Sequence, residues 1–152
     1  IGLCLDHGVS ERTEGLLHAA YLLDQARHLL HPPLSLLSDT SVDDKKLDHW
    51  IRSQQLDVII GYAEKHAALV RLGWKIPQEI GFSLLSNVHS PQGDEFAGFD
   101  TKTPILAASA VNFLVSLIHE QAYGLLNPPR SYMISGEFRD GNTLLQKSLG
   151  KA

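Results

Sequence analysis

The sequence has few of the features that mark several common kinds of protein. It contains one cysteine, Cys4, which excludes an internal disulfide framework, and this residue lies in an apolar run where a small buried side chain is expected. No apolar run approaches the ~20 residues of a membrane-spanning helix, and no signal peptide is visible. The 13 basic residues are outnumbered by 17 acidic ones, so nothing suggests that this segment itself binds a phosphate backbone.

Motifs for catalysis are equally scarce. No Gly-rich phosphate loop follows a predicted strand, and no Ser/His/Asp arrangement is apparent. The eight histidines lack paired spacing next to Asp or Cys, so they do not predict a metal site. We therefore predict no catalytic residue, no cofactor and no metal, and we do not expect an enzyme. A small α/β enzyme stays an alternative that would require an activated nucleophile or a phosphate loop.

The apolar segments that are present alternate between strand and helix patterns. Residues 56–62 are apolar without alternation, which is typical of a parallel strand covered on both faces. We predict that four such strands lie parallel in one sheet flanked by helices, the α/β fold class, at residues 1–6, 34–38, 57–62 and 80–85.

Helix boundaries can be assigned from a few residues. Ser41-x-x-Asp44 resembles a capping box at the start of the second helix. Gly73 occupies the position favoured after a helix C-terminus, so it is expected to end the helix at residues 63–72. Thr103-Pro104 is expected to begin the longest helix, which is mostly apolar, over residues 104–124, after a short extended piece at 96–100. A final strand is predicted at 130–138, and the tail after Leu145 is polar.

Four segments in this order resemble the effector-binding domain of LacI/GalR-type transcriptional regulators, whose fold is shared with type I periplasmic sugar-binding proteins. They are the strand and helix DVIIGYAEKHAALVRLG, the linker and strand GWKIPQEIGFSLLS, the crossover and long helix FAGFDTKTPILAASAVNFLVSLI, and the closing strand SGEFRDGNTL. The resemblance covers residues 57–144, and the first 50 residues fit it more loosely, as the strand and helix that open the second lobe.

The resemblance implies a division of the chain. Residues 1–95 would form the second, C-terminal lobe of a type I periplasmic-binding-protein-like fold. Residues 96–129 would form the crossover and the long helix that packs on a first lobe, 130–145 the closing strand, and 146–152 a tail. A helix-turn-helix head and most of the first lobe would lie upstream. Without its partner the long helix would expose an apolar surface, which predicts self-association or a rearranged packing.

Candidate ligand-binding residues follow from the expected sheet. Ligands of open parallel sheets bind outside the carboxyl ends of the strands, where polar side chains and an aromatic ring suit a sugar. The candidates at these ends are Asp6, Arg12, Tyr62, Ser86 and Asp100. Asp6 could instead cap a turn, and Arg12 could simply be solvated.

The family pattern differs from the sequence at two of these positions. Tyr62-Ala63 stand where the family commonly has Asn-Asp, and Ser86 stands where it commonly has Asp. Both differences remove polar groups that would hold a sugar, so it stays open whether the effector is a different kind of molecule.

The expected function is the effector-sensing domain of a LacI-type DNA-binding transcriptional regulator that binds a small sugar-like ligand between two lobes. Such a protein would be cytoplasmic and a homodimer, and it would bind DNA through the upstream head. The alternative is a periplasmic sugar-binding receptor of a transport system, which would require an upstream signal peptide.

Overall fold

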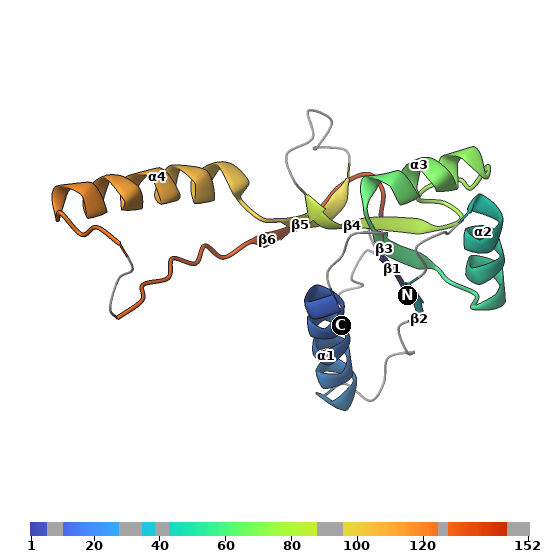
Figure 1. Cartoon of the computed structure of the whole chain (residues 1–152). Coiled ribbons are helices and arrows are strands. Elements are labelled where there is room, and N and C mark those ends of the chain that lie inside the picture. The colour runs from blue at the N-terminus through green and yellow to red at the C-terminus, as the bar shows by residue number, and fades with distance from the viewer. Residues whose placement is uncertain (6–10, 28–34, 39–42, 88–95, 125–127, 146–152) are drawn as a thin grey trace, which may run out of the picture.

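A computed structural model of the chain describes residues 1–5, 11–27, 35–38, 43–87, 96–124 and 128–145 (Figure 1). Six strands form one sheet in the order β2-β1-β3-β4-β5-β6. The strands are β1 (Gly2–Leu5), β2 (Ser35–Ser38), β3 (Val58–Gly61), β4 (Gly81–Asn87), β5 (Ala97–Asp100) and β6 (Glu137–Arg139). All neighbouring pairs are parallel except β5 and β6, which are antiparallel. The prediction that the first four strands lie parallel in one sheet is confirmed.

Four helices connect these strands. They are α1 (Glu11–Arg27), α2 (Asp44–Ser53), α3 (Ala63–Arg71) and α4 (Thr103–His119). In Figure 1, α2 and α3 lie on one side of the sheet and α1 on the other. The connections from β1 to β2, from β2 to β3 and from β3 to β4 each contain one of these helices, which is the usual crossover between parallel strands.

The hydrophobic core lies between the sheet and the pair α2 and α3. Leu47, Trp50 and Ile51 of α2 are buried there against Ile59 and Phe82 of the central strands. Cys4 is fully buried, as predicted, and Trp50 is 8% exposed, so both are packing residues. The core therefore belongs to the lobe built by residues 1–87 and 96–100, within the part of the chain described above.

Local sequence explains where α2 and α3 begin and end. Asp43 caps α2, because its carboxylate accepts a hydrogen bond of 2.7 Å from the backbone amide of Lys46. The capping box predicted at Ser41 and Asp44 is wrong, since the helix begins at Asp44 with Asp43 as its cap. Gly73 follows α3 with a φ of +86°, a left-handed conformation that glycine adopts without strain, and its predicted role is confirmed.

Beyond β5 the chain leaves the sheet as an arm, residues 101–136, that consists of α4 and an extended return to β6 (Figure 1). The helix ends at His119 and not at residue 124, because Gln121 and Gly124 take left-handed conformations. The strand predicted at 130–138 is limited to Glu137–Arg139. Residues 128–136 lack a neighbouring strand with which to form a ladder, so their strand propensity is not realised.

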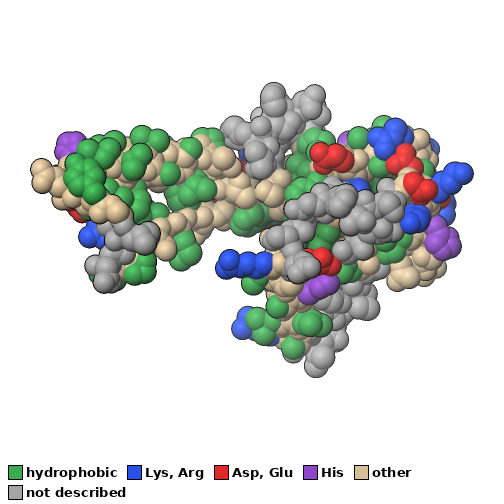
Figure 2. Space-filling view, in the orientation of Figure 1, with side chains coloured by type: hydrophobic (Ala, Val, Ile, Leu, Met, Phe, Trp, Pro, Cys, Tyr) green, Lys and Arg blue, Asp and Glu red, His purple; other side chains and the backbone are tan. Residues whose placement is uncertain are grey.

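The arm exposes its apolar side chains. No residue of α4 is buried, although the helix is mostly apolar. Figure 2 shows hydrophobic side chains spread over the arm. The large exposed ones on the helix are Ile105, Leu106, Val111, Leu114, Val115 and Ile118. One ring contact joins the two halves of the arm, with the centroids of Phe113 and Tyr132 4.8 Å apart.

The segment after β6 closes the lobe at the amino end of β4 and β5. The backbone carbonyl of Thr143 accepts a hydrogen bond of 2.8 Å from the amide of Phe82, and its buried hydroxyl accepts one of 3.0 Å from the amide of Ala97. Gly141 lies so close to Phe96 and Ala97 that a Cβ atom there would be 2.3 Å from the backbone. Gly141 and Thr143 thus hold the segment after β6 against β4 and β5.

Candidate ligand-binding site

The carboxyl ends of β3, β4 and β5 meet at one edge of the sheet. Gly61 of β3 pairs with Leu84 of β4, and Asn87 of β4 pairs with Asp100 of β5. Because the strands are parallel, the residues that end them lie along the same edge. The structure therefore places three of the five predicted site residues there, namely Tyr62, Ser86 and Asp100.

Two of these residues are half-buried. Tyr62 follows β3 and takes the N-cap position of α3, but its side chain makes no capping hydrogen bond. Ser86 is the next-to-last residue of β4, before Asn87. An aromatic ring and a hydroxyl are thus present at the carboxyl ends of two adjacent strands, where ligands of parallel sheets bind.

The other two predicted residues belong to the connection after β1. Arg12 is the second residue of α1 and its side chain is exposed. Asp6 lies outside the described residues. The ligand contacts predicted for these two side chains therefore stay predictions.

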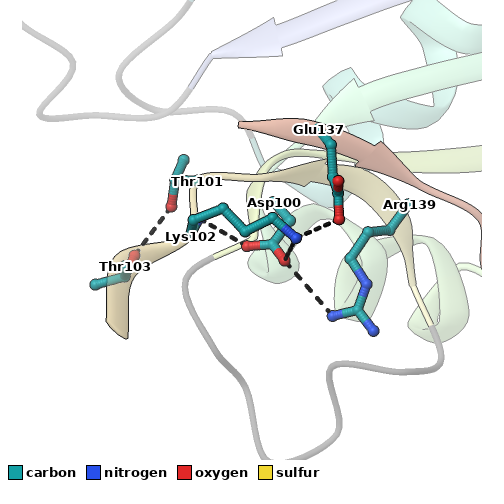
Figure 3. A network of polar contacts seen from close by, with 6 residues as sticks. All are labelled: Asp100, Thr101, Lys102, Thr103, Glu137 and Arg139. Carbon is teal, nitrogen blue, oxygen red and sulfur yellow. Dashed lines mark hydrogen bonds and ion pairs between the residues drawn. The ribbon is translucent and has the colours of Figure 1, made fainter. Parts of the chain in front are cut away.

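Asp100 differs from its neighbours because its carboxylate is already engaged within the protein (Figure 3). Its side chain is 8% exposed, and its Oδ1 accepts a hydrogen bond of 2.8 Å from the backbone amide of Lys102. Its Oδ2 lies 3.5 Å from the ammonium of Lys102 and 3.8 Å from Nη1 of Arg139. The hydrogen bond from the Lys102 amide lowers the pKa of Asp100 despite the opposing effect of burial.

Lys102 connects the two strands that carry the arm. Its ammonium donates a hydrogen bond to the carboxylate of Glu137, which raises the pKa of Lys102. Asp100 of β5 pairs directly with Glu137 of β6, and Gly98 pairs with Arg139, so all these charges lie on one face of the strand pair. We call Asp100, Lys102, Glu137 and Arg139 the crossing network.

Sequence reasoning identified Asp100 but missed the other three members of the crossing network. Glu137 is 35 residues away from Lys102 along the chain, so no local pattern joins them. The sequence contained one signal. Glu137 and Arg139 are two residues apart in a strand, so their side chains lie on the same face of the sheet.

A separate cavity of about 310 Å³ lies away from this edge. It is lined by Arg52, Leu72, Gly73, Trp74 and Glu79, at the ends of α2 and α3 that precede β3 and β4. The guanidinium of Arg52 lies 4.7 Å from the ring centre of Trp74, and both side chains bond to Asp48. This cavity is therefore at the amino edge of the sheet, opposite the edge that the sequence predicts.

Two other features are absent from the described part of the chain. No three His, Cys, Asp or Glu side chains come together there in a way that could hold a metal ion. None of the four helices is both long and apolar enough to cross a membrane.

This sheet of mostly parallel strands flanked by helices has the fold of periplasmic-binding-protein-like LacI domains, and three solved structures match it. A protein from Corynebacterium glutamicum described as a transcription regulation repressor of the LacI family matches with a TM-score of 0.63 and 14% identity, covering 93% of this chain and 56% of its own. A protein from Bacillus cereus subsp. cytotoxis described as a LacI transcriptional regulator matches with a TM-score of 0.61 and 10% identity, covering 96% of this chain and 54% of its own.

A third structure contains a bound sugar. It is the periplasmic binding protein/LacI transcriptional regulator from Alkaliphilus metalliredigens, complexed with D-xylulofuranose. It matches with a TM-score of 0.63 and 17% identity, and covers 95% of this chain and 57% of its own. The chain thus spans a little over half the length of these proteins. No protein-family model and no curated protein matches the sequence. The likeness confirms the predicted fold class.

Proposed function

We propose that the chain is the second lobe of the effector-binding domain of a LacI-type transcriptional regulator, and that it binds a small sugar-like ligand between two lobes. In the complete protein a helix-turn-helix head would bind DNA, and the regulator would act in the cytoplasm as a homodimer. Ligand binding would change the angle between the lobes and thereby the spacing of two heads. We propose that the protein binds its ligand without converting it, and therefore that it is not an enzyme.

The observation that carries the proposal is the arm and its two crossing strands. β5 leaves the lobe, α4 buries none of its residues, and the chain returns as β6. Exposed apolar surface on this scale is rare on a protein without a partner for it. A first lobe that packs on α4 would cover this surface, and the similar solved structures have the additional length for one.

The division of the chain follows from the same observation. Residues 1–95 would build the second lobe, 96–129 would form the crossover and the long helix that packs on the first lobe, and 130–145 would form the closing strand. The proposed ligand contacts are Tyr62 and Ser86 at the strand ends, with Asp6 and Arg12 from the connection after β1. Asp100 lies at the same edge beside the crossing, where a ligand between the lobes would meet it.

One observation favours a second candidate, the sugar-binding receptor of a transport system. The similar structure with D-xylulofuranose is described as a periplasmic binding protein as well as a LacI regulator. The two candidates share the fold and the cleft and differ in what lies upstream. A signal peptide would identify the receptor, and a DNA-binding head would identify the regulator.

Ligand binding is tested by thermal unfolding of the full-length protein with a panel of pentoses, hexoses and their ketoses, D-xylulose included. A ligand present at a hundred times its Kd is expected to stabilise the folded state by about 2.7 kcal/mol. If none of the sugars in the panel stabilised the protein, the proposal of a sugar-like ligand would be contradicted.

A matched pair of variants then places the site. Ser86→Ala removes a hydroxyl at the carboxyl edge, and Ser53→Ala removes one at the opposite edge, where it bonds to the carbonyl of Trp50. Ser86→Ala is expected to weaken the ligand by about tenfold, and Ser53→Ala to leave affinity unchanged. Equal effects of the two changes would place the ligand elsewhere.

A further inference from the structure

The arm is connected to the lobe at a single crossing. Asp100 ends β5 and Glu137 begins β6, and these two residues pair with each other. Between them lie α4, none of whose residues is buried, and a return segment that pairs with no strand among its described residues. The direction of the arm is therefore set by what happens at the crossing.

Lys102, two residues after the end of β5, has a strained backbone conformation. Lys102 has φ 54° and ψ 39°, the left-handed region that residues other than glycine rarely enter. Asp100 stabilises this turn, because its side chain accepts the amide of the residue two positions later, as in an Asx turn. Lys102 is also the N-cap of α4, so its conformation directs the helix.

The same lysine links the outgoing strand to the returning one. Its ammonium contacts Asp100 on one side and Glu137 on the other, and Arg139 contacts Asp100 from β6. The crossing network therefore contains two acidic and two basic side chains, and its net charge is zero. The side chain of Asp100 is buried and that of Lys102 is 25% exposed, so water screens this network less than an open surface ion pair.

We propose that the crossing network is a latch that fixes the direction of the arm relative to the lobe, with Asp100 and Glu137 as positioning residues that act through Lys102. Opening the latch frees the arm without unfolding the lobe, because the core between the sheet and the helices α2 and α3 includes none of the four residues. In a two-lobed regulator the latch would limit the angle between the lobes. Only that consequence rests on the proposed function.

Trypsin provides a direct measure of the latch, because it cuts after lysine and Lys102 is one of the latch residues. The initial rate of cleavage between Lys102 and Thr103 reports local opening at the crossing. Cleavage between Arg71 and Leu72, at the end of α3, reports unfolding of the lobe in the same sample. No ligand is needed, so the result does not depend on whether a sugar binds.

Three variants of the full chain complete the experiment. Glu137→Gln removes one carboxylate of the latch from a side chain that is 60% exposed, so folding of the lobe is preserved. Asp100→Asn keeps an oxygen for the amide of Lys102 but removes the charge. Glu120→Gln is the matched control, since Glu120 pairs with Arg130 at the far end of the arm.

We expect Glu137→Gln to raise cleavage after Lys102 by about threefold and Asp100→Asn by about tenfold, because each removes a charge-assisted contact. Glu120→Gln should leave it unchanged, and cleavage after Arg71 should stay at the wild-type rate in Glu137→Gln. Wild-type cleavage after Lys102 in Glu137→Gln would overturn the latch. A rise at Lys102 that is matched at Arg71 in that variant would overturn it as well, because the network would then support the whole lobe.

Discussion

The carboxylate of Asp100 accepts a hydrogen bond of 2.8 Å from the backbone amide of Lys102, at the point where the chain leaves the sheet. This contact stabilises a left-handed residue at the start of α4 and lowers the pKa of the carboxyl group. One short-range interaction thus affects the path of a long arm.

The contribution of Asp100 to stability depends on pH in a defined direction. Its pKa is lowered in the folded protein, so its stabilising effect is complete above the ordinary aspartate pKa of about 3.9 and is lost as the pH falls through the folded value. Lys102 has a raised pKa, so its effect persists up to the ordinary lysine pKa of about 10.4 and is lost as the pH rises further. Urea unfolding of wild type and Asp100→Asn should differ by a constant amount between these limits. A difference that changes near neutral pH would contradict the charges assigned here.

The hydroxyl of Thr143 should be worth a measurable part of the stability of the lobe. Thr143→Val keeps the shape of the side chain but leaves the buried amide of Ala97 without its acceptor. The expected loss is about 1–3 kcal/mol in the free energy of unfolding, measured by urea titration. Thr143→Ser retains the hydroxyl and should lose clearly less. A Thr143→Val variant as stable as wild type would show that this hydrogen bond does not contribute to stability.

Two glycines should respond in opposite ways to the same substitution. A Cβ at Gly98 would lie 2.6 Å from the carbonyl oxygen of Leu84, in the backbone of the adjacent strand, so Gly98→Ala should destabilise by about 1–3 kcal/mol. Gly15 lies within α1 with no atom within 4 Å of such a Cβ. Gly15→Ala should stabilise by about 0.5–1 kcal/mol, because alanine is the better helix former. Thermal unfolding of both variants measures these changes in stability. If Gly98→Ala were as stable as wild type, the register between β4 and β5 would be wrong.

The exposed face of α4 should make the 152-residue chain associate with itself at high concentration. Leu114 is 58% exposed in the middle of this helix, so Leu114→Glu should lower the associated fraction in sedimentation velocity. Asn112→Asp, which adds a negative charge at an exposed polar position on the same helix, is the control and should associate like wild type. A chain that stays monomeric at every concentration would show that the arm needs no partner.

The sequence was sufficient to predict the sheet because the information is local and repeated. Residues 57–62 and 80–85 are apolar without alternation, and that pattern requires burial on both faces, hence a parallel sheet with helices between the strands. Gly73 could be assigned as a helix end because only a residue that tolerates a positive φ suits that position.

The crossing could not be predicted in the same way. Glu137 and Lys102 meet only after β6 has paired with β5, and pairing across so many residues leaves no local pattern. The strand predicted at 130–138 was too long for a related reason, since extended propensity becomes a strand only where another strand is available. Asp43 replaced Ser41 as the cap of α2 because several residues near a helix start can cap it, and the final geometry selects one.

The most direct test of the proposed function is to determine the coding sequence upstream of Ile1. We expect a helix-turn-helix head followed by a first α/β lobe, whose surface would cover α4. A signal peptide followed by that lobe would contradict the regulator and favour the transport receptor. An upstream region without a lobe of this kind would contradict the two-lobed domain itself.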